Sequence, residues 1–298
     1  EPDETGPLSR GEAAVAQGQI QYILASCYYQ LEDYTQALGC YQLAAYFCGD
    51  EPAYQRDLAV CYARLGYSAD AQQTVAVLQG METQPGDVEL VAGEIAYAAG
   101  DYPQALELLS QASQLSEDHT VISRASIQAA QCCRQLGDDW IDQEVELLQN
   151  ASRRLNASEN GAQLQLLAET LIRLGGLDSS RREESYEQAL SCLEELMARG
   201  QATFAVRQNA ALVLEYLNRF EEAEELLLQL QTDYPQDYRP PMRLALLYAD
   251  REGTKPLESR SYDQFEAAYQ QAQSLYSTSA APDSDMVRLQ ELAAQLGI

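Results

Sequence analysis

Apolar residues recur three and four positions apart along most of the chain, with polar residues between them. This spacing places the apolar residues of 19–30 on one face of a helix, and those of 34–44 on one face of a second helix. The polar stretch between them, Leu31 to Asp33, is only long enough for a tight turn. The pattern therefore predicts pairs of antiparallel helices joined by short turns.

The same pattern returns at a fixed period of about 34 residues, a length typical of helical repeats. Ala37, Ala71 and Ala105 keep this step, and so do Tyr186 and Phe220 in the second half. Small residues recur where two helices would cross closely, because a bulky side chain there would hold the backbones apart. A single helical pair cannot bury its apolar face alone, so a stack of such pairs with a shared core is expected.

These repeats resemble the tetratricopeptide repeat (TPR) family, whose unit is a helix–turn–helix of about 34 residues. The residues that carry the resemblance in the first unit and in one later unit are Leu24, Ala25, Tyr28, Tyr34, Ala37, Tyr41 and Ala44, then Ala210, Ala211, Leu214, Phe220, Ala223, Leu227, Leu230 and Pro235. The family's usual early tryptophan is absent, since Gln21, Gln55 and Glu89 stand in its place. The resemblance implies an all-α, right-handed superhelical solenoid of about seven repeats.

Three regions are expected along the chain. Residues 1–12 form a flexible acidic lead-in, residues 13–281 a TPR-like solenoid with insertions near 175–184 and 250–260, and residues 282–298 a capping helix. The fourth repeat, near 122–155, is irregular, and we expect its second helix to be shifted and lengthened. The chain does not begin with methionine, and we expect it to be part of a longer protein that could carry an anchor or signal.

Charge limits the classes of partner. The chain of 298 residues has 46 acidic and 19 basic residues, a net charge of −27. This field repels nucleic acids and anionic lipid surfaces. No apolar run approaches the ~20 residues that cross a bilayer. We therefore expect a protein or peptide partner, no nucleic acid, and no direct membrane insertion by this segment.

Metal and redox chemistry have little support in the sequence. Seven cysteines occur without a CxxC pair, and His119 is the only histidine. A zinc site needs about four convergent ligands at short spacing, so no metal and no cofactor are expected. Free thiols among apolar helical neighbours favour a cytoplasmic location.

Candidate partner-binding residues follow from the resemblance, which implies that the first helices of the repeats line a concave groove. Tyrosine and arginine are enriched at binding hot spots. The residues expected to face the groove and bind the partner are Tyr22, Tyr29, Arg56, Arg64, Tyr97, Gln131, Arg134 and Arg173. Some TPR domains clamp a terminal carboxylate with lysine and asparagine, but the matching positions here hold Tyr22, Ser26 and Asp57. Binding of chaperone tails is therefore not expected.

The leading interpretation is a non-enzymatic scaffold that holds a peptide or partner protein in the groove. An alternative is a C-terminal regulatory or sensor region of a larger bacterial signalling protein, such as a membrane-anchored Ser/Thr kinase. A helical-repeat hydrolase is a third reading, with little support. Its acidic pairs, such as Glu194–Glu195, are neighbours on a helix and point about 100° apart, so they cannot face one substrate together.

Overall fold

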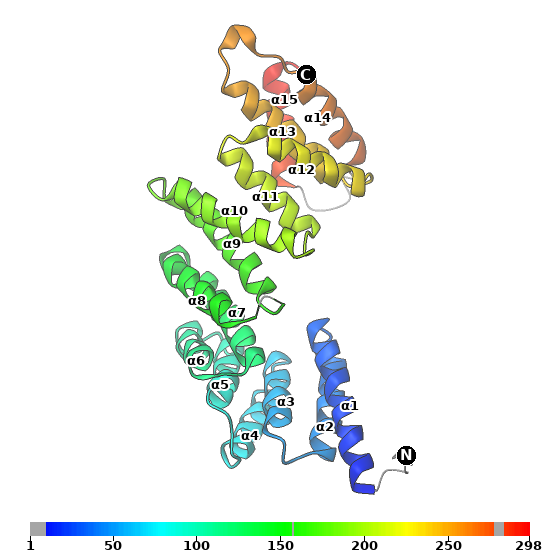
Figure 1. The fold of residues 1–298 in the computed structure, drawn as a ribbon, viewed down its shortest axis with the longest axis vertical. Coiled ribbons are helices and arrows are strands. Elements are labelled where there is room, and N and C mark those ends of the chain that lie inside the picture. The colour runs from blue at the N-terminus through cyan, green and yellow to red at the C-terminus, as the bar shows by residue number, and fades with distance from the viewer. Residues whose placement is uncertain (1–9, 157, 277–282) are drawn as a thin grey trace, which may run out of the picture. The chain divides into compact units, whose positions relative to one another are not determined.

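The computed structural model describes residues 10–156, 158–276 and 283–298. Within these ranges every regular element is a helix, and the helices follow one another as antiparallel pairs (Figure 1). In this part of the chain no helix is both long and apolar enough to cross a lipid bilayer. The chain divides into two compact units, Glu1–Gln163 and Leu164–Ile298, which are described separately.

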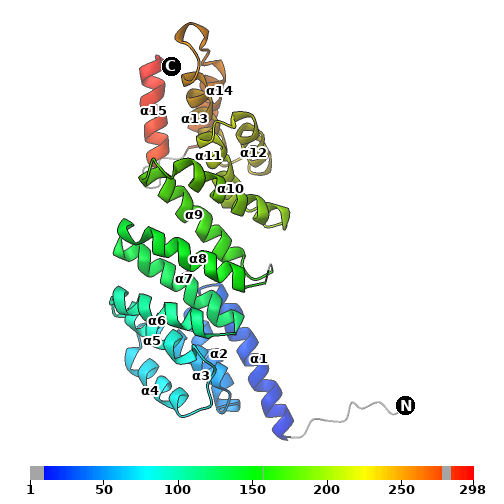
Figure 2. The ribbon, with the colours of Figure 1, turned by 60° about the vertical axis from the view of Figure 1, so that its left-hand side comes forward.

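The first unit contains four helical hairpins, counted over its described residues. They are α1 (Arg10–Gln30) with α2 (Tyr34–Phe47), α3 (Pro52–Arg64) with α4 (Ser68–Gln79), α5 (Asp87–Ala98) with α6 (Tyr102–Leu115), and α7 (His119–Leu136) with α8 (Ile141–Arg154). A short 3₁₀ helix, η1 (Asp138–Trp140), joins α7 to α8. Helices α5 to α8 lie side by side in chain order (Figure 2).

The second unit contains three hairpins and a final single helix, again among its described residues. They are α9 (Gly161–Leu177) with α10 (Arg182–Ala198), α11 (Phe204–Tyr216) with α12 (Phe220–Asp233), and α13 (Arg239–Gly253) with α14 (Asp263–Leu275), then α15 (Ser284–Leu296). A 3₁₀ turn, η2 (Leu257–Ser259), precedes α14. Helix α15 packs on α13 and α14, with Met286, Leu289 and Ala293 buried. The expected capping helix therefore covers the last hairpin.

Small residues form the helix crossings, as the period predicts. Ala37, Ala71 and Ala105 are fully buried. At Gly93 the approach is tighter still, because a Cβ built there would lie 2.6 Å from Cγ of Leu109 on α6. The larger side chains, such as Tyr41, fill the space around these contacts. Each hairpin thus buries its apolar face against its neighbours within the unit.

Three expected boundaries differ from those of the structure. Helix α1 begins at Arg10, inside the expected lead-in, and Glu12 in its first turn suits the positive end of the helix dipole; residues 1–9 lie outside the described residues. The 175–184 insertion is mostly helical, since α9 extends through Leu177 and α10 starts at Arg182, leaving a short loop. In the fourth repeat the longer helix is α7, with 18 residues, whereas α8 has the same 14 as α2.

The turns inside the hairpins share one backbone geometry at the repeat period. Glu32, Gly66 and Gly100 occupy equivalent positions in three successive repeats, and all have positive φ, between 60° and 79°. At the third turn, Asp101 N donates to Ala96 O at 3.0 Å and Gly100 N donates to Tyr97 O at 3.0 Å. This pairing closes the end of a helix through a left-handed residue, which favours glycine.

We expect Gly100→Ala to lower the free energy of unfolding of the first unit by about 1 kcal/mol. A new Cβ would meet no atom within 4 Å, so the loss comes from the left-handed backbone alone. Gly39→Ala is the matched control: Gly39 lies within α2, also with open space around it, and alanine should stabilise a helix there. Urea unfolding followed by fluorescence of Trp140, the only tryptophan, measures both. Equal effects at the two positions would contradict this account of the turn.

Candidate functional site

A buried cluster of charges connects the first helices of the first unit. Asp57 on α3 is fully buried and sits at its centre. Its carboxylate accepts hydrogen bonds from Arg56 Nε at 2.9 Å, Arg124 Nη1 at 2.8 Å and Tyr22 Oη at 2.7 Å. The Asp57 cluster consists of Tyr22, Arg56, Asp57, Asp87, Asp118 and Arg124.

Arg56 extends the cluster to the start of two further helices. Its Nη1 donates to Asp87 at 3.0 Å and to Asp118 at 2.9 Å. Both carboxylates also accept backbone N–H groups, Asp87 from Gln84 and Asp118 from Thr120. The cluster therefore fixes the starts of α5 and α7 relative to α3. Burial alone would raise the pKa of Asp118, but Arg56 and the Thr120 N–H outweigh it and hold that pKa below its ordinary value.

A second polar group lies beside the first. Arg64 Nη2 donates to Glu94 at 2.9 Å and also to Gln128 Oε1. Glu94 and Gln128 are both 1% exposed. Burial raises the pKa of Glu94, and Arg64 opposes that shift. Arg64 thus joins α3 to α5 and α7, and its charge is compensated inside the protein.

An open hollow of about 510 Å³ lies in the first unit, and Arg64 and Arg124 are part of its lining. Its walls come from the end of α1 and the turn into α2, the end of α3, and the part of α7 from His119 to Gln131, with Glu159 at one edge. The lining residues are Tyr29, Gln30, Glu32, Tyr34, Arg64, His119, Thr120, Ser123, Arg124, Ile127, Gln128, Gln131 and Glu159.

Aromatic and polar groups mix on this lining. The guanidinium carbon of Arg124 lies 4.5 Å from the centre of the Tyr29 ring, which in turn packs edge-on against Tyr34 at 5.1 Å. Burial raises the pKa of Tyr29, and Glu94 adds to the shift, so its hydroxyl stays neutral. At the edge, His119 Nδ1 lies 2.6 Å from Glu159 Oε2. The hollow can offer ring faces and hydrogen-bonding groups together.

The structure brings three of the predicted partner-binding residues into this hollow: Tyr29, Arg64 and Gln131. Two others belong to the Asp57 cluster. Arg56 was expected to face the groove and bind the partner, but it is 3% exposed, because three carboxylates surround its guanidinium. Tyr22 donates to Asp57 and stacks on Tyr54 at 4.3 Å.

The remaining three predicted residues lie elsewhere. Tyr97 packs edge-on against Tyr102 at 5.4 Å, within the α5–α6 hairpin. Arg134 Nε donates to the buried Glu144 at 2.7 Å, which ties α7 to α8. Arg173 is a half-buried residue of α9, in the second unit. None of the three lines the hollow.

Sequence reasoning missed several lining residues, chiefly those of α7. The repeat step that joins Ala59 to Gly93 next reaches Ile127, a large residue, so the repeat pattern is less regular on that helix. The register identified Gln131 there, but not Ser123 or Gln128. Tyr34 and Glu32 were assigned to the hairpin turn and its core. The only sequence signal that these two residues could bind a partner was that an acidic and an aromatic side chain occur together at this turn.

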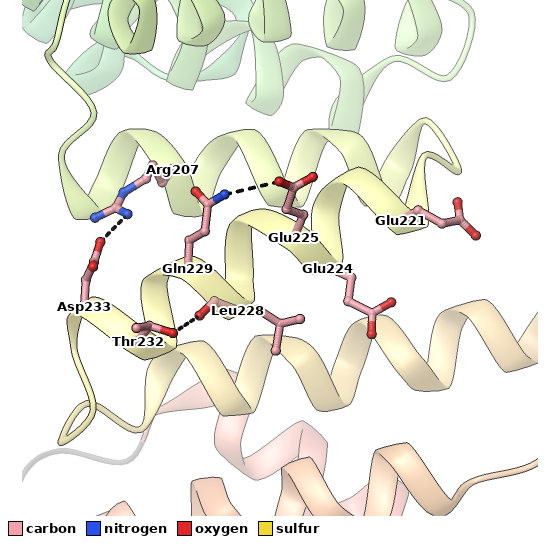
Figure 3. A pocket seen from close by; sticks show the side chains of 8 residues that line it. All are labelled: Arg207, Glu221, Glu224, Glu225, Leu228, Gln229, Thr232 and Asp233. Atoms are coloured by element: carbon pink, nitrogen blue, oxygen red, sulfur yellow. Dashed lines mark hydrogen bonds and ion pairs between the residues drawn. The ribbon is translucent and has the colours of Figure 1, made fainter.

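A second hollow, of about 690 Å³, lies in the second unit (Figure 3). Of its eight lining residues, only Arg207 comes from outside α12, so it is a surface depression along one helix. Arg207 pairs with Asp233 at 2.6 Å, and Gln229 donates to Glu225 (Figure 3). Glu224 accepts from Tyr248 and Arg251 of α13, both at 2.8 Å. Most of its polar groups are thus already paired, either with one another or with α13, and we take the hollow of the first unit as the candidate site.

The chain is a helical-repeat protein. Its successive helical hairpins share their apolar faces, and polar groups on the first helices surround a hollow. Comparison with known proteins gives the kind of repeat. The chain has the fold of TPR proteins, which confirms the predicted resemblance and the all-α repeat architecture.

Solved structures of TPR type match most of the chain at low sequence identity. The C-terminal part of a TPR repeat-containing protein from Cytophaga hutchinsonii is 13% identical, with a TM-score of 0.55, covering 90% of this chain and 98% of that one. The pilF protein of Pseudomonas aeruginosa is 16% identical, with a TM-score of 0.51, covering 82% and 100%. Human IFIT1 is 13% identical, with a TM-score of 0.53, covering 94% and 64%.

One curated protein is similar over part of its length. The tetratricopeptide repeat protein 30 homolog of Aedes aegypti is 29% identical over 99 residues, or 33% of this chain. The match spans 15% of that protein's length. No family model matches the chain.

Proposed function

We propose that the chain is a non-enzymatic protein-interaction scaffold, and that the hollow of its first unit holds a segment of a partner protein. The observation that supports this most directly is the lining itself. Tyr29 and Tyr34 offer ring faces, and Gln131 and Ser123 offer hydrogen-bonding groups. They lie beside Arg64 and Arg124, which hydrogen bonds to buried carboxylates hold in place. Anchoring aromatics among fixed polar groups are typical of peptide recognition.

Charge favours a basic segment as the occupant. Arg64 and Arg124 are each compensated by a buried carboxylate, Glu94 and Asp57. The exposed carboxylate of Glu32 then remains on the lining. The net charge of −27 also raises the encounter rate of a positively charged partner and disfavours an anionic one. Binding should therefore weaken as salt is added.

The predicted residues take two roles in this proposal. Tyr29, Arg64 and Gln131 contact the partner segment. Tyr22 and Arg56 act as positioning residues, through the Asp57 cluster. Tyr97, Arg134 and Arg173 stay predictions that this hollow does not include.

A variant with a larger side chain in the hollow tests the proposal. Peptides selected from a random library against the wild-type chain should bind Gln131→Trp at least roughly tenfold more weakly, because indole would occupy the space that the peptide needs. Gln135→Trp is the matched control, since Gln135 is exposed on the same helix outside the lining. Fluorescence anisotropy of a labelled peptide measures each affinity. Equal affinity for the wild type and both variants would place binding elsewhere and reject the hollow.

A further inference from the structure

Three buried polar atoms at the wall of the hollow have no hydrogen-bond partner among the described residues. They are Arg64 Nε, Gln128 Nε2 and Glu94 Oε2. Arg64 and Gln128 line the hollow, and Glu94 lies behind Arg64 and pairs with it. Buried polar groups in proteins are nearly always hydrogen-bonded, because a buried donor or acceptor without a partner has lost its hydration for nothing. Three such atoms at one edge of a hollow point to a ligand that supplies the missing partners.

The three atoms lie around one guanidinium group. Arg64 Nη2 donates to Glu94 Oε1 at 2.9 Å and also to Gln128 Oε1. Each unpartnered atom belongs to the same planar group as one of these bonded atoms, so two spare donors and one spare acceptor lie close together. The Arg64 group consists of Arg64, Glu94 and Gln128. Its members come from α3, α5 and α7, whose apolar residues share one buried core that holds the group in place.

The Arg64 group disfavours a charged occupant of either sign. A cation would meet the guanidinium of Arg64, and that of Arg124 on the same lining. An anion would suit the two spare donors, but it would meet the spare oxygen of the Glu94 carboxylate. Either ion would also lose its hydration at a buried place. A neutral group that both accepts and donates a hydrogen bond avoids these costs. The carboxamides of Asn and Gln and the hydroxyls of Ser and Thr are such groups.

We propose that the Arg64 group binds one neutral polar side chain of the partner segment, a carboxamide or a hydroxyl. The oxygen of that side chain accepts from Arg64 Nε and Gln128 Nε2, and its N–H or O–H donates to Glu94 Oε2. Because the three atoms are recessed, a side chain of the segment reaches them, and its main chain does not. The proposal rests on the proposed function of the hollow and adds one requirement to it. A segment that is basic overall carries an uncharged polar residue at this position.

Selected peptides test the proposal on the wild-type chain. Peptides selected from a random library should share one Asn, Gln, Ser or Thr residue. Replacing that residue with an apolar one of similar shape (Leu, Met, Ala or Val, in the same order) should weaken binding by roughly tenfold, because its hydrogen bonds to the Arg64 group are lost. Fluorescence anisotropy of the labelled peptides measures each affinity.

Gln128→Met shows whether the shared residue meets the Arg64 group. Methionine has nearly the shape of glutamine but no donor, so the same peptide replacement should cost about threefold or less in this variant. Gln135→Met is the matched control, since Gln135 is exposed on the same helix outside the lining, and there the replacement should cost as much as in the wild type. Circular dichroism checks that both variants remain folded.

The wild-type chain gives a second readout that needs no variant. The Nε–H of Arg64 has its own signal in a proton–nitrogen correlation spectrum, and this signal reports a new hydrogen bond directly. At saturation it should shift with the selected peptide, and much less with the apolar counterpart of that peptide. Equal shifts with the two peptides would contradict the proposed contact.

The outcomes separate this proposal from the proposed function. If Gln131→Trp blocks the peptides but they share no neutral polar residue, the hollow remains the binding site and the Arg64 group is not read. An equal cost of the peptide replacement in the wild type and in Gln128→Met would overturn the proposal in the same way. If Gln131→Trp leaves the affinity unchanged, binding lies elsewhere, and both the hollow and the role of the Arg64 group are rejected.

Discussion

Asp57→Ala should lower the free energy of unfolding of the first unit by about 4 kcal/mol. The carboxylate is fully buried and accepts hydrogen bonds from two arginines and a tyrosine. Arg56 would keep Asp87 and Asp118, but Arg124 would lose the carboxylate at 2.8 Å that compensates it. Removing one partner of a buried pair costs far more than the pair contributes net, because the remaining charge stays desolvated.

Urea unfolding followed by Trp140 fluorescence measures this loss, since Trp140 lies in η1 of the same unit. Glu159→Ala is the control for a carboxylate of an exposed pair, and it should change stability by less than about 1 kcal/mol. Asp57→Asn should fall between the two, because the amide oxygen still accepts hydrogen bonds but carries no charge. An unchanged urea midpoint for Asp57→Ala would show that the cluster does not hold the helices together.

Acid should reduce the difference in the free energy of unfolding between the wild type and Asp57→Asn. Burial alone would raise the pKa of Asp57, but Arg124 and Arg56 outweigh it and hold that pKa below its ordinary value. A carboxyl whose pKa is lower in the folded than in the unfolded state stabilises the fold above the unfolded value, near 4. This stabilisation is lost as the pH falls through the folded value. The difference in unfolding free energy should therefore be largest at neutral pH and shrink below about pH 4. A difference that stays constant with pH would contradict the role given to the Asp57 charge.

The hairpins could be predicted from the sequence because they depend on local spacing. Ala37, Ala71 and Ala105 mark the close helix crossings at one fixed step, and each is fully buried. The capping helix followed from the apolar face of Met286, Leu289 and Ala293 in the same way. Such contacts form between neighbouring elements, so a period in the sequence becomes a period in space.

The candidate site could be predicted only in part, because its charges pair across several repeats. Arg56 was assigned to the open wall by register, but it reaches Asp87 and Asp118, which lie 31 and 62 residues away. Spacing identifies the face of a helix and gives no information on which carboxylate a long side chain will meet. Leu24 shows a related limit: it fits the same pattern as Leu58 one repeat later, yet Leu24 is 40% exposed and Leu58 is 8% exposed in the structure.

Gly93→Val should lower the free energy of unfolding by about 3 kcal/mol. A Cβ at this position would lie 2.6 Å from Leu109 Cγ and 3.2 Å from the Leu109 backbone nitrogen. The leucine side chain could rotate away only by leaving its fully buried position, and the backbone would have to move with α6. The helices α5 and α6 would then separate at their crossing.

A double-mutant cycle distinguishes this clash from a general effect of valine in a helix. Leu109→Ala alone should cost about 2–5 kcal/mol, because it leaves a cavity. In that background Gly93→Val should cost at least roughly 1 kcal/mol less than in the wild type, since the clashing atoms are gone. Gly39→Val adds the same side chain to open space on α2 and should change stability by less than about 0.5 kcal/mol. Additive losses at Gly93 and Leu109 would mean that the two residues do not oppose each other, and that the small residue at this point of the repeat is not required by the helix crossing.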